Sequence, residues 1–273
     1  MSVATVEAKV FKIPIIGLGT WALRGSDCAR LTDAAIRIGY RHIDTAQMYD
    51  NETEVGEGVR ASGLRSQVMI TTKVQPTMLA PADVDRSVKQ SLAKLKIDAI
   101  DLLLIHWPNP KVPLADTLGA MAKLKREGVT RQIGVSNFTV ALLAEANKLS
   151  SEALVCDQVE CHPFLDQDKV IAACRKAGMA LVAYSPIARG GAVGDKVLER
   201  IAKAHNKTAA QVSLRWLTQQ GIVVIPRTSK FERLKENFDI LDFDLSDAEM
   251  KEIAGLGHKG GRIVDWTWSP KWD

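Results

Sequence analysis

The sequence predicts a single-domain (β/α)8 TIM barrel, an α/β fold in which eight parallel strands alternate with helices. Eight short apolar runs alternate with longer amphipathic segments from near the start of the chain almost to its end. Each connecting segment is long enough for a parallel crossover. Because no Gly/Ser-rich linker interrupts the alternation, residues 1–273 are expected to form one domain, with extra C-terminal helices and a tail.

The eight predicted strands are short and apolar. They are IIGLGTW (15–21), YRHID (40–44), VMITTKV (68–74), AIDLLLIHW (99–107), VTRQIGVSN (129–137), LVCDQVE (154–160), MALVAYS (179–185) and GIVVIPR (221–227). Eight is the number of strands that closes this type of barrel.

Helix signals lie between the strands. Asn51 and Glu54 have the spacing of a capping box. Pro81 suits the first turn of a helix, and Gly128 is a stop signal after AMAKLKRE.

The last crossover, at about residues 190–220, holds two helical segments that separate near Asn206. After the eighth strand, Ser246 and Glu249 predict the cap of one further helix. These helices are additions to the barrel.

A doubly wound sheet is the competing α/β fold, and its mark would be a glycine-rich turn after the first strand. Gly17 and Gly19 form only a GxG, which Trp21 follows without a third glycine, and no GxxxxGK[ST] sequence occurs. The barrel is therefore preferred.

Composition excludes several classes of protein. The chain is 46% hydrophobic and 25% charged, which is typical of globular rather than disordered or fibrous proteins. Its net charge of +4 is small and spread along the chain, so no nucleic-acid partner is expected. No stretch is long and apolar enough for a membrane helix or a signal peptide.

The four cysteines form neither a CxxC pair nor a metal-ligand spacing, and they are too few for a disulfide scaffold. We expect reduced thiols, no metal site and a cytoplasmic protein. No long heptad pattern demands association, so a monomer is expected.

Polar and aromatic residues lie at the predicted C-terminal ends of the strands, where barrel enzymes place their chemistry. Four of them, from neighbouring units, are Asp44, Tyr49, Lys73 and His106. Each has a structural alternative. Lys73 could reach solvent at the strand rim, and His106 could be a buried structural histidine, as His42 is expected to be. Asp44 could cap a loop, and Tyr49 could cover the rim. Their convergence on one mouth favours a proton-transfer site.

Eight short motifs follow one another along the whole chain. They are GLGTW (17–21), GYRHIDTAQMYDNE (39–52), ITTKV (70–74), DLLLIHWP (101–108), IGVSNF (133–138), QVECHP (158–163), AYSPIARG (183–190) and IPRTSK (225–230). In this order they resemble the aldo-keto reductase family. The chain looks most similar to the bacterial 2,5-diketogluconate reductase-like group, whose members are short and end in an aromatic tail similar to WTWSPKWD (266–273).

The resemblance implies a barrel that binds NADPH (NADP+) across its mouth and reduces aldehydes or ketones to alcohols. The small-molecule carbonyl substrates would be keto-sugars, α-dicarbonyls or aromatic aldehydes. The catalytic residues carried over by motif are Asp44, Tyr49, Lys73 and His106.

The resemblance also implies three groups of cofactor-binding residues. The nicotinamide would be held by Trp21, Ser136, Asn137, Gln158 and Tyr184. Gly19, Thr20 and Asp44 would also bind the cofactor. The pyrophosphate would be covered by Ser185, Ile187, Gly190 and Gly191. The adenosine phosphate would be bound by Arg227, Thr228, Arg233, Glu236 and Asn237. The family more often has lysine in place of Arg227.

Aromatic and apolar residues predict the substrate pocket. The candidates are Trp21, Met48, Tyr49, His106, Trp107, Trp266 and Trp268. Three of the six tryptophans lie within the last eight residues, where a solvated tail would not need them. The structural alternative is that these rings only pin the terminus to the barrel.

Carbonyl reduction needs a proton at the oxygen, and Tyr49 is the expected donor. The pKa of a free tyrosine is about 10, so Lys73 is expected to lower it, while Asp44 keeps the lysine charged. Neutral His106 would orient the substrate oxygen. The rival assignment makes His106 the proton donor.

Two other functions stay open. Lys73 could be the nucleophile of a Schiff-base aldolase, although Tyr184 and the basic segment 227–233 would then have no role. A redox-sensing barrel would keep the NADPH-binding residues, but the four catalytic residues argue for turnover.

Overall fold

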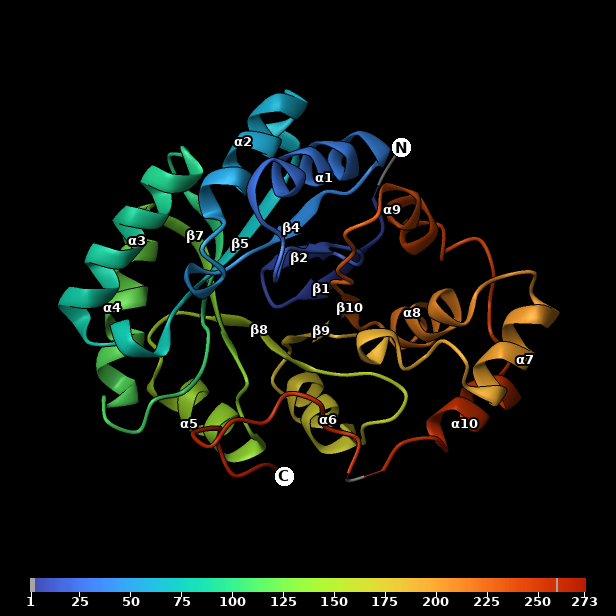
Figure 1. The fold of residues 1–273 in the computed structure, drawn as a ribbon. Coiled ribbons are helices and arrows are strands. Elements are labelled where there is room, and N and C mark those ends of the chain that lie inside the picture. The colour runs from blue at the N-terminus through green and yellow to red at the C-terminus, as the bar shows by residue number, and fades with distance from the viewer. Residues whose placement is uncertain (1–2, 259) are drawn as a thin grey trace.

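The computed structural model describes residues 3–258 and 260–273. A parallel sheet of eight strands runs in chain order and curls into a barrel, with helices around its outside (Figure 1). The strands are β3 (Leu18–Gly19), β4 (His42–Asp44), β5 (Met69–Val74), β6 (Ile100–Ile105), β7 (Thr130–Ser136), β8 (Leu154–Glu160), β9 (Ala180–Tyr184) and β10 (Val223–Val224). Each lies inside a predicted run, so the predicted barrel is confirmed.

Hydrogen bonds between the first and last strands of the sheet close the barrel. The Gly17 N–H donates to the Val224 carbonyl over 2.8 Å, and the Gly19 N–H donates to the Pro226 carbonyl over 3.1 Å. A Cβ atom on Gly19 would lie 2.6 Å from the Ile225 carbonyl oxygen. The close approach of these two backbones therefore requires glycine at this position.

The helices agree with most of the predicted boundaries. They are α1 (Gly25–Ile38), α2 (Glu52–Ser62), α3 (Pro81–Leu95), α4 (Leu114–Arg126), α5 (Val140–Leu149), α6 (Asp168–Lys176), α7 (Lys196–Ala204), α8 (Ala209–Gln219), α9 (Phe231–Phe238) and α10 (Asp247–Ala254). Asn206 separates α7 from α8 with a φ of 53°, and Ser246 and Glu249 form the predicted capping box of α10. Because α9 precedes α10, two helices rather than one follow the eighth strand.

The predicted capping box at the start of α2 is wrong. Asn51 precedes the helix, but its side chain makes no capping hydrogen bond. Its amide donates instead to the carbonyls of Thr20 at 2.8 Å and Leu23 at 3.1 Å, and its Oδ1 accepts from the Thr45 hydroxyl at 2.8 Å. The side chain therefore ties the loop after β3 to the loop after β4.

An N-terminal hairpin, which was not predicted, lies at the other end of the barrel. Strands β1 (Thr5–Ala8) and β2 (Phe11–Pro14) pair in antiparallel fashion. Ala8 and Ile13 belong to the same apolar cluster as Met69, the first residue of β5. The hairpin therefore covers the barrel interior at the N-terminal ends of the strands, opposite the predicted site.

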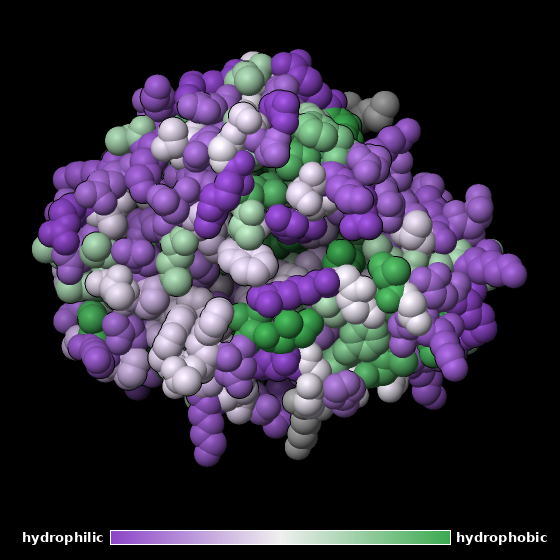
Figure 2. Space-filling view, viewed as in Figure 1, coloured by the Kyte–Doolittle hydropathy of each residue, from purple (hydrophilic) through white to green (hydrophobic). Residues whose placement is uncertain are grey.

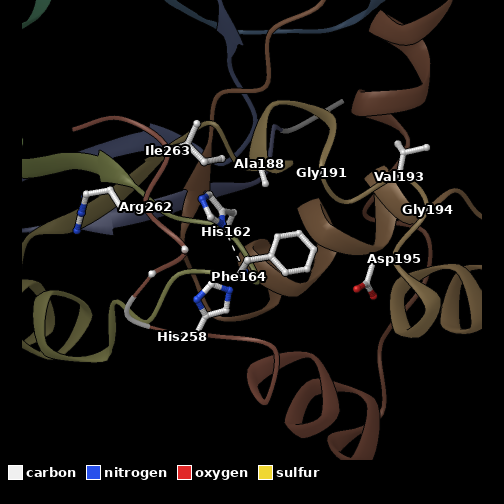
Figure 3. Close-up of a pocket in the computed structure, with 12 residues that line it drawn as sticks. His162, Phe164, Ala188, Gly191, Val193, Gly194, Asp195, His258, Arg262 and Ile263 are labelled. Carbon is white, nitrogen blue, oxygen red and sulfur yellow. Dashed lines mark hydrogen bonds between the residues drawn. The ribbon is translucent and has the colours of Figure 1, made fainter. Parts of the chain in front are cut away.

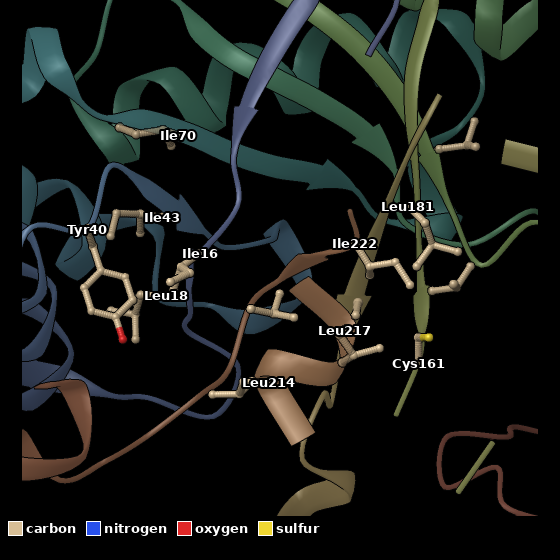
Figure 4. Close-up of a cluster of buried hydrophobic side chains, with 14 of the residues drawn as sticks. Ile16, Leu18, Tyr40, Ile43, Ile70, Cys161, Leu181, Leu214, Leu217 and Ile222 are labelled. Atoms are coloured by element: carbon tan, nitrogen blue, oxygen red, sulfur yellow. The ribbon is translucent and has the colours of Figure 1, made fainter. Parts of the chain in front are cut away.

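The core has an inner and an outer part because strand residues alternate between two faces. On β6, Leu102 and Leu104 belong to the inner cluster, whereas Leu103 and Ile105 belong to the outer cluster between strands and helices. Figure 4 shows part of the outer cluster, in which strand residues such as Leu181 meet α8.

Hydrophilic residues cover most of the face drawn in Figure 2, and apolar groups are visible in a hollow near its centre. Within residues 3–258 and 260–273, no helix is both long enough and apolar enough to cross a membrane.

We expect Gly19→Ala to destabilise the closed barrel by about 1–3 kcal/mol, because the new Cβ would force β3 and β10 apart. Gly119→Ala is the matched control, since a Cβ there meets nothing within 4 Å and alanine favours the interior of α4. Urea unfolding followed by circular dichroism measures both variants. Equal midpoints in the two variants would contradict the role of Gly19 in closure.

Candidate active site

The catalytic candidates meet at the C-terminal edge of the barrel. Asp44 ends β4, Lys73 lies near the end of β5, and His106 directly follows β6. On β5, the Thr72 hydroxyl donates to Glu52 of α2, outside the barrel, at 2.7 Å. Lys73 is the next residue, so its side chain points into the barrel.

The Lys73 ammonium has three hydrogen-bond partners. Its Nζ lies 2.5 Å from Asp44 Oδ1, 2.8 Å from the Thr45 carbonyl oxygen and 3.4 Å from the Tyr49 hydroxyl. The side chain has no exposed surface, so the alternative in which Lys73 reaches solvent at the rim is wrong. The three contacts use all three donors of the ammonium.

Tyr49 comes from a short 3₁₀ turn, Gln47–Tyr49, that follows β4. The Gln47 Oε1 accepts from the Gln75 N–H at 3.0 Å, and Arg24 donates to the Tyr49 carbonyl. These contacts hold the Tyr49 ring edge-on to the His106 ring, with centroids 5.5 Å apart and planes at 79°. The hydroxyl and the imidazole therefore share one mouth.

Gln158 on β8 supports the ion pair from across the barrel. Its side-chain Nε2 donates to Asp44 Oδ2 at 2.6 Å, and its main-chain carbonyl accepts from the Ser136 hydroxyl at 2.7 Å. Both Asp44 oxygens therefore have a donor, Lys73 on one and Gln158 on the other.

Asn137 connects His106 with Tyr184. Its Nδ2 donates to the His106 carbonyl at 2.9 Å, and its Oδ1 accepts from the Tyr184 hydroxyl at 2.8 Å. Asn137 has a φ of 62°, a left-handed conformation that asparagine adopts more readily than most residues. The half-buried Tyr184 ring at the end of β9 is thus fixed through its hydroxyl.

Burial and the ion pair set the protonation of the site. Burial lowers the pKa of Lys73 and raises the pKa of Asp44, and each effect is opposed by the partner's charge. Burial and the Asp44 charge raise the pKa of Tyr49 well above its usual value, so the predicted lowering is not found and the hydroxyl stays protonated. Burial and the Lys73 charge lower the pKa of His106 well below its usual value, which leaves the imidazole neutral.

Comparison with known protein families shows to which family the chain belongs. The family model described as "Aldo/keto reductase family" matches residues 15–258. The chain belongs to the Aldo/keto reductase family. It is therefore an oxidoreductase that reduces carbonyl compounds, and the family predicted from the motifs is confirmed.

Several related proteins align with this chain over nearly its whole length. "Methylglyoxal reductase DkgB" from Escherichia coli O157:H7 is 38% identical over 265 residues, which are 96% of this chain and 99% of that protein. A crystal structure described as a suggested 2,5-diketo-D-gluconic acid reductase B is 42% identical with a TM-score of 0.96 and covers 99% of this chain and 98% of its own. The Bombyx mori aldo-keto reductase in complex with NADP is 31% identical with a TM-score of 0.90, covering 97% and 96%.

The predicted pyrophosphate segment of this reductase follows β9. Ser185 and Gly190 have left-handed φ values of 49° and 98°, so the chain turns sharply there. The Arg189 guanidinium lies 4.7 Å from the Trp21 ring centroid, which joins the segment to the loop after β3. Ile187 packs against the outer cluster of the core.

A pocket of about 600 Å³ lies between this segment and the chain that leads into the tail (Figure 3). Gly191 and His258 line its two sides, and His162 and Phe164 lie between them. The His162 ring donates to Glu160 at 2.9 Å and accepts from the Phe164 N–H at 3.3 Å. None of the four catalytic candidates lines this pocket.

The predicted adenosine-phosphate residues lie just before α9 and along it. Arg227 is exposed and donates from Nε to the Trp21 carbonyl at 3.2 Å. Arg233 lies exposed in the first turn of α9, whereas Glu236 accepts from the hydroxyl that caps α8. Thr228 and Asn237 are buried.

Aromatic rings of the tail cover Trp107, the residue after His106. The Trp268 and Trp107 centroids lie 5.0 Å apart, and those of Trp272 and Trp107 lie 6.1 Å apart. The Trp266 ring stacks on the Trp268 ring, with centroids 6.3 Å apart. The tail therefore attaches to the barrel beside the catalytic mouth, and its effect on substrate choice stays a prediction.

The sequence predicted the catalytic cluster but missed several of its contacts. Thr45, Gln47 and Trp272 were not predicted, although the first two lie within the GYRHIDTAQMYDNE motif and the third repeats the tryptophan pattern of the tail. Met48, a predicted substrate residue, is exposed beside Tyr49. In the part of the chain that the structure describes, no group of three His, Cys, Asp or Glu residues could hold a metal ion.

We expect Trp268→Ala to raise KM for an aromatic aldehyde by about 2- to 10-fold, because an aromatic pair contributes about 0.5–1.5 kcal/mol. Trp266→Ala is the control, since its ring contacts Trp268 and lies outside the pair with Trp107. Steady-state kinetics with both variants tests this expectation. Unchanged KM in Trp268→Ala with a lower melting temperature would make the ring a structural pin.

Proposed function

We propose that this enzyme uses NADPH to reduce aldehydes and ketones to alcohols, with Tyr49 as the proton donor. The observation that carries the proposal is the fully buried Lys73 ammonium, which bonds Asp44 and lies 3.4 Å from the Tyr49 hydroxyl. Such a cation stabilises the negative charge that develops on the tyrosine oxygen as its proton leaves.

The residues around the mouth fit NADPH. The Tyr184 ring is held by Asn137 and half-exposed, so it offers a flat surface for the nicotinamide ring. Arg227 and Arg233 are exposed guanidinium groups suited to a phosphate on the adenosine half. The NADP complex of the Bombyx mori relative supports this assignment. When bound, NADPH supplies the hydride that the carbonyl carbon receives.

The side chains of the protein supply the proton and the geometry. Tyr49 is protonated because burial and the Asp44 charge raise its pKa, so its hydroxyl can donate to the carbonyl oxygen. Lys73 then faces the phenolate. Neutral His106 donates a hydrogen bond that orients the same oxygen.

His106 is a weaker candidate for the proton donor. Burial and the Lys73 charge hold its pKa well below the usual value, so the imidazolium form is disfavoured. A neutral imidazole is a far weaker acid than an imidazolium. This assignment would also leave the buried pair of Asp44 and Lys73 without a role.

The surroundings of Lys73 also argue against a Schiff-base aldolase. Its amine has three hydrogen-bond partners and no exposed surface, whereas a lysine nucleophile must reach a carbonyl carbon with a free amine. Borohydride treatment with substrate is therefore expected to trap no adduct on this lysine.

The proposed substrates are α-dicarbonyls, small keto-sugars and aromatic aldehydes. Methylglyoxal is an α-dicarbonyl, and it gives its name to the activity of the Escherichia coli relative. NADPH oxidation against methylglyoxal, aromatic aldehydes, α-keto esters and keto-sugar acids tests this range. NADPH binding without turnover across the panel would favour the redox-sensing alternative.

We also propose that residues 1–273 form a single domain that works as a monomer in the cytoplasm, without a nucleic-acid or membrane partner. The support is the unbroken strand and helix alternation, the small net charge of +4 and the absence of a heptad pattern. The cysteines Cys28, Cys156, Cys161 and Cys174 are free and buried, which suits a reducing compartment.

We expect Tyr49→Phe to lower kcat/KM by about 100- to 10,000-fold, because general acid catalysis contributes that much, while NADPH affinity stays within about threefold. Lys73→Met should be comparably damaging. Tyr40→Phe is the control, since this buried hydroxyl donates to the Leu234 carbonyl away from the mouth. Retention of more than about a tenth of the parent rate in Tyr49→Phe would favour His106 as the donor.

We expect NADPH to be preferred over NADH, with Arg227 and Arg233 as the discriminating residues. Arg227→Ala or Arg233→Ala should weaken NADPH binding by about 10- to 150-fold, since a charge-assisted contact contributes about 1.5–3 kcal/mol. NADH affinity should barely change because NADH lacks the 2′-phosphate. Fluorescence titration measures both, with Lys235→Ala on the same helix as the control. Equal losses for the two cofactors would refute the assignment.

A further inference from the structure

A buried carboxylate outside the catalytic cluster holds the start of the tail. Glu160 is the last residue of β8, and its side chain has no exposed surface. Its Oε1 accepts from the Ile263 N–H at 2.7 Å and from His162 Nε2 at 2.9 Å, and its Oε2 accepts from the Val264 N–H at 2.8 Å. Two of the three donors are therefore main-chain groups of the tail.

These donors keep Glu160 charged in a buried position. Burial alone would raise its pKa, but the hydrogen bonds from His162, Ile263 and Val264 lower it below the usual value. The tail forms no helix or strand over residues 261–273, so its main-chain N–H groups have no partners in regular structure. A buried carboxylate satisfies two of them with charge-assisted bonds, which are stronger than neutral ones.

From this anchor the tail runs past α6 to α5 (Figure 1). Its Trp268 ring packs on Trp107, the residue after His106. At the far end, Asp273 Oδ2 accepts from the Val140 N–H at the start of α5 at 2.9 Å. The tryptophan that borders the mouth therefore lies between two attachment points, and only the first is buried in the barrel.

Strand β8 connects the tail with the catalytic cluster. Gln158 and Glu160 are two residues apart, so they lie on the same face of the strand. Gln158 donates to Asp44, and Glu160 accepts from the tail.

We propose that Glu160 is a positioning residue for substrate selection, because its carboxylate fixes the start of the tail and so holds Trp268 against Trp107. The proposal rests on the carbonyl reductase function proposed above. Loss of the carboxylate loosens the tail and weakens the binding of large carbonyl substrates. Proton transfer is unaffected, since Glu160 touches none of the four catalytic residues.

Glu160→Gln tests the proposal with a change of charge at almost constant size. Trypsin should cleave after Arg262 about tenfold faster than in the parent, and mass spectrometry would detect the released peptide that begins at Ile263. KM for an aromatic aldehyde should rise about tenfold, while KM for methylglyoxal and kcat for both substrates stay within about twofold. NADPH affinity should be that of the parent.

Asp101→Asn is the matched control. Asp101 is also a buried carboxylate, and it lies at the start of β6, at the opposite end of the barrel. It forms ion pairs with Arg65 and Arg131. The same chemical change there should lower stability without changing tail cleavage or KM. Equal tail cleavage in both variants would show a general loss of stability and overturn the proposal.

A pair of proline variants in the tail keeps the test available if Glu160→Gln fails to fold. Val264→Pro removes the N–H that donates to Glu160 Oε2 and leaves the Arg262–Ile263 bond open to trypsin. Val264 is partly exposed and belongs to neither apolar cluster of the core. Thr267→Pro is its control, since this residue follows Trp266 in a turn closed by the Ser269 N–H, where proline is tolerated. Only the first should accelerate cleavage after Arg262 and raise KM for the aromatic aldehyde.

A chain that ends at Arg262 shows whether Glu160 acts through the tail. In that chain Glu160 has no tail donor to lose, so Glu160→Gln should change KM for the aromatic aldehyde by less than about twofold. A further rise in KM, or an equal fall in kcat for both substrates, would overturn the proposal. If the parent chain oxidised no NADPH with any carbonyl, the proposed function would fail, but trypsin cleavage would still test the anchor.

Discussion

The ion pair between Lys73 and Asp44 is the interaction on which the rest of the site depends. Lys73 Nζ and Asp44 Oδ1 are 2.5 Å apart, and both side chains are buried. Loss of one member of such a pair costs about 3–5 kcal/mol, because the other charge is left uncompensated. The chain therefore has to hold both members in place, and it uses three strands to do so: β4 carries Asp44, β5 carries Lys73, and β8 carries Gln158, which satisfies the second carboxylate oxygen. A closed barrel suits this task, since it brings Asp44 and Gln158, 114 residues apart in sequence, into hydrogen-bond contact.

The same ion pair shifts the pKa values of Tyr49 and His106 in opposite directions. The Asp44 charge, together with burial, raises the pKa of Tyr49 and so keeps a proton on the hydroxyl. The Lys73 charge, together with burial, lowers the pKa of His106 and so removes the imidazolium. The lysine also faces the oxygen on which negative charge appears when the tyrosine proton leaves. These opposite effects support Tyr49 as the acid and His106 as the group that orients the substrate, although both residues lie in the same mouth.

Much of the barrel and the catalytic cluster could be predicted because both follow from local patterns. Strands have a period of two, and the ends of parallel strands share one edge, so a lysine at position 73 could be placed near an aspartate at position 44. The failures have distant or environmental causes. Asn51 has a local capping pattern, but its amide is used by carbonyls 28 and 31 residues away. The raised pKa of Tyr49 depends on burial, which the sequence does not show. The contact between Glu160 and Ile263 spans 103 residues and has no local signal.

The catalytic residues and the tail beside them lie on different kinds of segment. Asp44, Lys73 and His106 come from strands or from residues directly after them, where hydrogen bonds between strands fix the backbone. The tail has no regular structure over residues 261–273, so its path depends on a few contacts, among them those with Glu160, Trp107 and Val140. Its residues between those contacts are less restricted by packing than strand residues are. Because Gln158 and Glu160 lie two residues apart on one face of β8, the same rigid strand serves as the reference for the catalytic carboxylate and for the tail beside the mouth.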